Sequence, residues 1–174
     1  MTLQLAVVLP TRNERGNIAP MVARLESVLG ESGWEAIFVD DDSPDGTADE
    51  IRRIAATDPR IRVIQRIGRR GLASAAIEGM CATAAPVVAV MDADHQHDPA
   101  LLPQMLQAIQ SGEYDLVYAS RFAEGGSAAG LSSEFREKGS RIANSLARKV
   151  TGVTLTDPMS GYFMLPTETV RREA

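Results

Sequence analysis

Short apolar runs alternate with helical segments up to residue 119, and this alternation is the feature that most limits the fold. Five apolar runs are typical of strands, at 3–9, 36–39, 61–64, 86–91 and 115–119. Apolar residues recur at helical spacing between them, over 17–29, 47–56, 71–83 and 100–110. Strands that alternate with helices of this length predict an α/β fold, Rossmann-like, with a mostly parallel sheet and helices on both faces.

The last third of the chain has a different pattern. Residues 123–133 are rich in glycine, alanine and serine, which predicts a flexible loop able to close over a ligand. A helix is predicted over 134–150, with Ile142, Leu146 and Val150 on one face. Because the length suits one hydrophobic core and no linker interrupts the sequence, we expect a single domain over residues 1–174.

Composition excludes several classes of protein. A hydrophobic fraction of 44% is too high for a disordered chain, and the lone Cys81 cannot make an internal disulfide. Apolar runs fall short of the roughly 18–20 residues of a membrane span, and the N-terminus lacks the pattern of a signal peptide. The net charge of −5 argues against nucleic acid as a partner. We therefore expect a globular cytoplasmic protein.

The acidic residues gather at two points that directly follow predicted strands. Seven of the 23 lie in these clusters: Asp40, Asp41, Asp42 and Asp45, then Asp92, Asp94 and Asp98. Ligands of an open parallel sheet bind beyond the carboxyl ends of its strands, and the polar residues 11–14 follow the first strand in the same way. Like charges held close together need a cation, a proton or a donor-rich ligand. We expect these clusters to converge on one ligand site.

Asp92 and Asp94 are the strongest candidates for a metal site. One residue separates the two carboxylates at a strand end, and Gln96 follows two residues later. Oxygen ligands of this kind suit Mg²⁺ or Mn²⁺, with the remaining positions left to water and to the phosphates of a ligand.

Two alternatives apply to the same segment. His95 and His97 offer imidazole ligands, which keep Zn²⁺ open as the ion. An isolated acidic pair is otherwise a solvated turn or a helix cap, and Asp98 before Pro99 is expected to cap the helix that follows.

The first acidic cluster divides into two parts. Asp40 and Asp42 lie at the strand end, where a carboxylate can accept hydrogen bonds from a nucleobase N–H or a ribose hydroxyl. Asp45, Gly46 and Thr47 are predicted to form a turn and to cap the next helix.

Arginine supplies most of the basic charge, and three arginines stand at positions suited to phosphate. Arg70 precedes a helix start, where backbone N–H groups and the guanidinium can receive a phosphate. Arg121 and Arg136 flank the glycine-rich loop, which can close over a diphosphate and exclude water. The alternative is that these arginines are solvated surface residues.

Seven motifs occur in order along nearly the whole chain. They are Leu-Pro-Thr-Arg-Asn-Glu (9–14), Asp-Asp-Asp-Ser-Pro-Asp-Gly-Thr (40–47), Gly-Leu-Ala-Ser-Ala (71–75), Asp-Ala-Asp-His-Gln-His-Asp-Pro (92–99), Ser-Arg-Phe with Gly-Gly (120–126), Phe-Arg (135–136) and Asp-Pro-Met-Ser-Gly-Tyr-Phe (157–163). In this combination the chain resembles the inverting family 2 glycosyltransferases, and specifically their dolichol- or polyprenol-phosphate mannosyltransferase branch.

The resemblance implies a GT-A fold that binds a nucleotide-diphospho-sugar, GDP-mannose or a UDP-hexose. It implies roles for a set of residues at the nucleotide and the metal: Pro10, Arg12, Glu14 and Asp42 at the nucleotide, and Asp92, Asp94 and Gln96 at a divalent metal, Mg²⁺ or Mn²⁺. It also places Arg121 and Arg136 at the donor diphosphate or acceptor phosphate, and Asp157 near the reaction centre.

Three features depart from the family pattern. Arg12 stands where an aromatic residue is frequent, and its guanidinium can still stack on a base. Arg70 replaces a common lysine, and Ala73 a common glycine. Family members usually continue well beyond the point that corresponds to Gly161, so the catalytic domain is expected to be short at its C-terminal end.

The expected reaction is transfer of a hexose, mannose at the family level, to a polyprenyl or dolichyl phosphate with inversion, with contact to a membrane surface. Two alternatives stay open: a sugar-hydroxyl acceptor, for which Asp157 is the leading general base, and a non-catalytic nucleotide-sugar-binding fragment. A sugar-nucleotide-synthesising enzyme would need a glycine- and lysine- or arginine-rich signature after the first strand, where this chain has 11–14.

Overall fold

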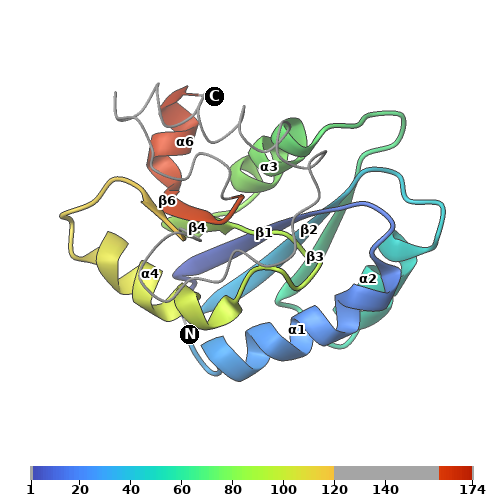
Figure 1. The fold of residues 1–174 in the computed structure, drawn as a ribbon, viewed down its shortest axis with the longest axis horizontal. Coiled ribbons are helices and arrows are strands. Elements are labelled where there is room, and N and C mark those ends of the chain that lie inside the picture. Colours follow the sequence, from blue (N-terminus) through green and yellow to red (C-terminus); the bar gives the residue numbers. More distant parts are fainter. Residues whose placement is uncertain (1, 120–160, 174) are drawn as a thin grey trace.

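A six-stranded sheet forms the centre of the fold (Figure 1). The computed structural model of the protein describes residues 2–119 and 161–173. The strands are β1 (Leu5–Thr11), β2 (Trp34–Asp40), β3 (Ile61–Gln65), β4 (Val87–Val90), β5 (Val117–Tyr118) and β6 (Phe163–Pro166). They lie in the order β3-β2-β1-β4-β6-β5, and the four neighbours from β3 to β4 are parallel. Strand β6 is antiparallel to both β4 and β5. Since three of the five neighbouring pairs are parallel, the predicted mostly parallel sheet is confirmed.

Helices cover both faces of the sheet, as the sequence predicts. They are α1 (Arg15–Leu29), α2 (Thr47–Ala55), α3 (Leu72–Cys81), the short 3-10 helix η1 (Pro99–Leu101), α4 (Leu102–Gln110) and α6 (Thr167–Glu173). Alternate side chains of β1 point to opposite faces: Leu5 and Val7 pack in the core with α1, α2 and α4, whereas Ala6 and Val8 pack with α3 and α6. Figure 1 shows α1 and α4 on one side of the sheet and α3 and α6 on the other.

Two expectations about the distal strands need correction. The strand predicted over 115–119 contains only Val117–Tyr118, and β6 separates it from β4. Strand β6 itself was not predicted, although a short apolar run precedes Pro166. The predicted loop over 123–133 and helix over 134–150 lie outside the described residues. Within residues 2–119 and 161–173, no helix is both long and apolar enough to cross a membrane.

Candidate active site

The polar segments that follow β1, β2 and β4 meet at the carboxyl edge of the sheet. Thr11 and Asp40 are register partners at the ends of β1 and β2, and Asp92 comes two residues after Val90 at the end of β4. The negative charges of Asp94 and Glu14 both act on Asp92, which places three carboxylates in one electrostatic neighbourhood. The segment after β1 and the acidic cluster after β4 therefore lie close together, and a single ligand site for both acidic clusters stays a prediction.

The loop after β1 is fastened to the loop after β2. Three successive backbone N–H groups, those of residues 13–15, donate to the side chains of Ser43, Thr47 and Asp45 at 2.8, 3.0 and 3.2 Å. These bonds satisfy backbone donors at the start of α1 that have no partner within the helix. Glu14 and the 40–47 loop are therefore held in one arrangement.

Asp40 has a different position from the one predicted. Its residue is completely buried, and both carboxylate oxygens accept hydrogen bonds from Ser43, from the backbone N at 3.0 Å and from Oγ at 2.5 Å. The structure thus makes Asp40 an organiser of the loop, with no side-chain surface open to a nucleotide. Asp42 is half-buried, with φ at +55°, and its Oδ1 accepts a bond from Gln65 at 3.2 Å.

The predicted turn at 45–47 is present, but Asp45 rather than Thr47 accepts the hydrogen bond at the start of α2. Asp45 Oδ1 accepts bonds from the backbone N of Thr47 at 3.0 Å and from its Oγ1 at 2.6 Å. Thr47 does not cap α2; its hydroxyl oxygen accepts the bond from Glu14. Gly46 between them has φ at +85°, a conformation that favours glycine.

Replacing Asp45 by alanine should lower the free energy of unfolding at pH 7 by about 1 kcal/mol, as for a lost helix cap. Burial raises the pKa of Asp45, but hydrogen bonds from Thr47 and from the Arg15 backbone outweigh it and leave the pKa lowered. The stabilisation is therefore complete above the ordinary pKa of 3.8 and is lost as the pH falls through the lower folded pKa. Urea unfolding from pH 7 downward measures this.

The exposed Asp49 provides the control for this prediction. Asp49 is 83% exposed in its ion pair with Arg52. Its replacement by alanine should therefore change the free energy of unfolding little, both at pH 7 and in acid. A difference between the Asp45 variant and the parent protein that does not shrink below pH 4 would contradict the assignment.

Asp92 and Asp94 form the acidic part of a turn that follows β4. Asp94 Oδ1 accepts the backbone N–H of Gln96 at 3.0 Å, and His95 takes φ of +65°. Burial, followed by the negative charges of Asp94 and Glu14, raises the pKa of the Asp92 carboxyl to about 7. The side chain of Asp92 is still 34% exposed, so a cation from solvent can reach it.

The two histidines of this turn are engaged in holding it. His97 Nδ1 accepts the backbone N–H of Asp92 at 3.0 Å, and its ring stacks on Tyr162 with centroids 5.2 Å apart. His95 Nδ1 accepts a hydrogen bond from Arg24 of α1 at 3.3 Å. Among the described residues, no three His, Cys, Asp or Glu side chains form a metal-binding group, and the histidines and the carboxylates of this turn are alike in this respect.

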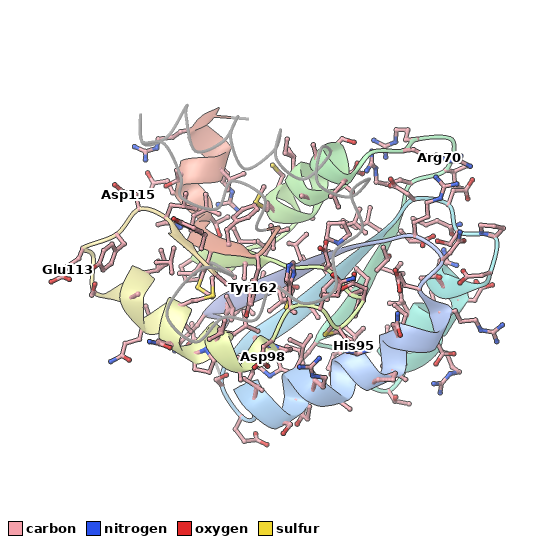
Figure 2. The ribbon with its side chains drawn as sticks, in the orientation of Figure 1. Arg70, His95, Asp98, Glu113, Asp115 and Tyr162 are labelled. Carbon is pink, nitrogen blue, oxygen red and sulfur yellow. The ribbon has the colours of Figure 1, made fainter. Side chains whose placement is uncertain are left out.

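Asp98 closes the turn and confirms its predicted role as a cap. Its Oδ1 accepts the backbone N–H of Ala100 at 3.1 Å at the start of η1. Arg24 lies 3.3 Å from the same carboxylate, and the hydroxyl of Tyr162 donates to the Asp98 carbonyl oxygen at 3.2 Å. Figure 2 shows His95 and Asp98 on the side of the molecule near α1, with Tyr162 toward the middle of the sheet.

The donor set of this turn fits a hard divalent cation. Asp92 and Asp94 supply carboxylate oxygens whose mutual repulsion a cation relieves, and Gln96 is exposed. Gly161 borders the Asp92 carboxylate: a Cβ at this position would lie 3.4 Å from Oδ2 and 3.8 Å from Oδ1. The glycine therefore leaves space beside the carboxylate that any other side chain would fill.

Three further residues predicted to bind the nucleotide lie at separate places in the structure. Pro10 is buried within β1, Arg12 is exposed, and Arg70 is exposed on the loop between β3 and α3. Figure 2 shows Arg70 well apart from His95 and Asp98. Arg121, Arg136 and Asp157 lie outside the described residues, so their roles stay predictions.

Sequence reasoning missed the residues at the end of β3. Gln65 reaches Asp42, and the buried Arg66 lies 2.9 Å from Asp41. The signal was available, because both are polar residues at a strand end, like those after β1, β2 and β4. Arg24 was also missed; α1 shows nothing in its own sequence to mark this residue as a partner of the 92–98 turn.

A mostly parallel sheet with an Asp-x-Asp turn at its carboxyl edge is the arrangement expected of the GT-A fold. The chain belongs to glycosyl transferase family 2, whose model matches residues 6–171. The α/β GT-A fold and the family resemblance are therefore confirmed.

Curated relatives of this chain are lipid-phosphate mannosyltransferases by name. Dolichol-phosphate mannosyltransferase of Pyrococcus furiosus is 34% identical over 171 residues, which cover 97% of this chain and 47% of that protein. Undecaprenyl-phosphate mannosyltransferase of Micrococcus luteus is 33% identical over 97% of this chain and 69% of its own length. The chain thus spans about half to two thirds of the length of these relatives.

Solved structures agree on the fold. The mannosyltransferase PcManGT from Pyrobaculum calidifontis, in complex with GDP-Man and Mn²⁺, superposes with a TM-score of 0.69 at 19% identity, over 100% of this chain and 47% of that one. Glucosyl-3-phosphoglycerate synthase from Mycobacterium tuberculosis, with Mn²⁺, UDP-Glc and phosphoglyceric acid, gives a TM-score of 0.63 at 26% identity over 95% and 57%.

Proposed function

We propose that this chain transfers mannose from GDP-mannose to a polyprenyl phosphate with inversion at the anomeric carbon. The observation that carries the proposal is the Asp92–Asp94 turn at the carboxyl end of β4, where the charge of Glu14, just before α1, also acts on Asp92. Relatives named for transfer of mannose to dolichol and undecaprenyl phosphate support this donor sugar and acceptor class. A lipid acceptor also favours contact of this domain with a membrane surface.

Asp92, Asp94 and Gln96 would hold a divalent cation, and Mg²⁺ or Mn²⁺ suits their oxygen atoms. Such an ion supplies positive charge beside the diphosphate that leaves. Structures of fold relatives that contain Mn²⁺ support this choice of ion. Glu14 adds a third negative charge nearby, and its position is fixed through Thr47.

The reaction needs little proton transfer if the acceptor is a phosphate. An oxygen of the acceptor phosphate attacks the anomeric carbon, and the bond from that carbon to the diphosphate oxygen breaks. The electron pair of that bond leaves with the nucleoside diphosphate, so negative charge grows on the leaving group. Arg121 and Arg136 are proposed to face this charge. Because the acceptor phosphate is already an anion near neutral pH, Asp157 is proposed to orient the acceptor rather than to deprotonate it.

Replacement of Asp157 by asparagine tests this division of roles. General-base catalysis contributes about 10²- to 10⁴-fold, so loss of a base should cost at least about a hundredfold in turnover. For a phosphate acceptor we expect a smaller loss, with the pH dependence of turnover unchanged. A drop of a hundredfold or more, together with loss of the basic-side increase in rate, would favour a sugar-hydroxyl acceptor.

A panel of donors and acceptors tests the proposed function directly. The purified chain is incubated with Mn²⁺, polyprenyl phosphate in vesicles, and GDP-mannose, UDP-glucose or UDP-N-acetylglucosamine in separate reactions. Of the three donors, we expect only GDP-mannose to give a product, polyprenyl-phosphomannose. Binding of donor with no transfer to any acceptor would instead support the alternative of a nucleotide-sugar-binding fragment.

A further inference from the structure

Arg66 is a buried arginine directly after β3, and neither the motifs nor the proposed reaction assigns it a role. Its side chain is 2% exposed. Nη1 lies 2.9 Å from Asp41 Oδ1, as an ion pair rather than an aligned hydrogen bond, and Nε lies 3.3 Å from Glu78 of α3. The guanidinium also donates to the Gly71 carbonyl at 3.1 Å and to Ser74 Oγ at 2.6 Å. We call these five residues the Arg66 latch.

The latch joins the two loops on which candidate nucleotide residues stand. Asp41 immediately precedes Asp42, and its Oδ2 accepts the backbone N–H of Gly71 at 2.7 Å. Gly71 follows Arg70 and has φ of +135°, a conformation that L side chains rarely adopt. The loop from Arg66 to Gly71 is therefore fixed at both ends to the segment that carries Asp42.

Stability alone is a weak reason for such a cluster. Removing a guanidinium and two carboxylates from water is costly, and well-packed apolar residues often stabilise a protein as much or more. A guanidinium can, however, bridge several acceptors in one fixed geometry, which an apolar side chain cannot do. The loop tip beyond the latch is not packed: Ile67 is 75% exposed, and Arg70 is exposed as well. Arg66 is thus the buried anchor of an otherwise exposed loop.

We propose that Arg66 is a positioning residue for binding of the donor's nucleoside diphosphate. It holds Arg70 and Asp42 at a fixed separation, so that both groups meet the ligand without a separate ordering step. This inference rests on the proposed function, since it takes Asp42 and Arg70 as nucleotide contacts. It assigns Arg66 itself no contact with the ligand.

Replacement of Arg66 by lysine is the first test, because lysine keeps the charge and loses the fork that bridges the two loops. The affinity of GDP, in the presence of Mn²⁺, is measured by calorimetry. Partners that orient a ligating group from behind are typically worth about ten- to a hundredfold in metal sites, so we expect GDP to bind roughly tenfold more weakly. Hydrogen exchange of the Gly71 amide should accelerate, whereas Mn²⁺ affinity and kcat at saturating donor should stay within about twofold.

Arg62 provides the matched control on the same strand. It pairs with Glu35 at 2.8 Å near the other end of β3, and its replacement by lysine should leave GDP affinity unchanged. A charge-free combination, Arg66→Met with Asp41→Asn and Glu78→Gln, avoids unpaired buried charge and keeps the protein folded. It should bind GDP as weakly as R66K.

The outcomes separate this inference from the proposed function. If the parent protein binds GDP and R66K binds it equally well, the latch is only structural and the inference is overturned. A lower melting temperature with unchanged GDP affinity overturns it in the same way. If the parent protein binds neither GDP nor UDP, the proposed function fails, and the role of Arg66 in donor binding fails with it.

Discussion

Replacing both Asp92 and Asp94 by asparagine is expected to abolish Mn²⁺ binding and to reduce sugar transfer by at least about a thousandfold. These two carboxylates are the charged ligands of the proposed metal site, and asparagine keeps their size while removing their charge. Calorimetric titration with Mn²⁺ measures the first effect, and release of nucleoside diphosphate measures the second. Transfer that survives in the double variant would overturn the metal assignment.

The single variant Asp92→Asn should stabilise the metal-free protein above neutral pH, although it removes a proposed metal ligand. The pKa of Asp92 is raised from 3.8 to about 7, so the folded state holds this proton more tightly than the unfolded state. The resulting stability is complete below pH 3.8 and is lost as the pH rises through 7. In metal-free protein the variant should therefore melt a few degrees above the parent at pH 8 and at nearly the same temperature at pH 4.

Asp98 offers the control for both measurements. It lies in the same turn, but its carboxylate caps η1, and asparagine is an equally good cap. The Asp98→Asn variant should keep its Mn²⁺ affinity and show no rise in melting temperature at pH 8. If it lost the metal as the Asp92 and Asp94 double variant is expected to, the disturbance would lie in the turn as a whole rather than in ligand charge.

The parallel half of the sheet could be predicted because its signals are local. Each strand from β1 to β4 is an apolar run that ends at polar or turn-forming residues, and each is followed by apolar residues at helical spacing. Parallel neighbours need a crossover helix, so the alternation itself carries the topology. Strand β6 has no such context. Its partner β4 lies far away in sequence, with Val88 opposite Leu165, and such a pairing leaves no periodic trace near either strand.

The candidate site likewise has features that could be predicted from the sequence and features that could not. That the acidic clusters lie at strand ends follows from the sequence, and the structure brings Glu14, Asp92 and Asp94 into one neighbourhood. The sequence does not show which of the carboxylates faces solvent. Asp42 and His95 take positive φ angles, which reverse the chain locally and decide which neighbouring side chains turn inward. Local pattern does not specify those angles for aspartate or histidine.

The close approach of α3 to the sheet depends on Gly79. A Cβ built at this position would lie 2.4 Å from Val8 Cγ1 and 2.9 Å from Val39 Cγ2, on β1 and β2. Branching at Cβ restricts the χ1 angle of valine in strands too, so neither side chain can turn away cheaply. We expect Gly79→Ala to lower the free energy of unfolding by about 1–3 kcal/mol, the usual range for overpacking a core.

Replacing Gly16 of α1 by alanine is the control, because its effect on the free energy of unfolding should have the opposite sign. A Cβ there would meet nothing within 4 Å, so Gly16→Ala should raise the free energy of unfolding by up to about 1 kcal/mol through helix propensity. At this chain length each kcal/mol corresponds to about 2–4 °C in melting temperature, so thermal unfolding resolves the two variants. Equal signs would contradict the packing argument. Because Gly71 of the Arg66 latch immediately precedes α3, the Gly79 variant should also speed hydrogen exchange at the Gly71 amide.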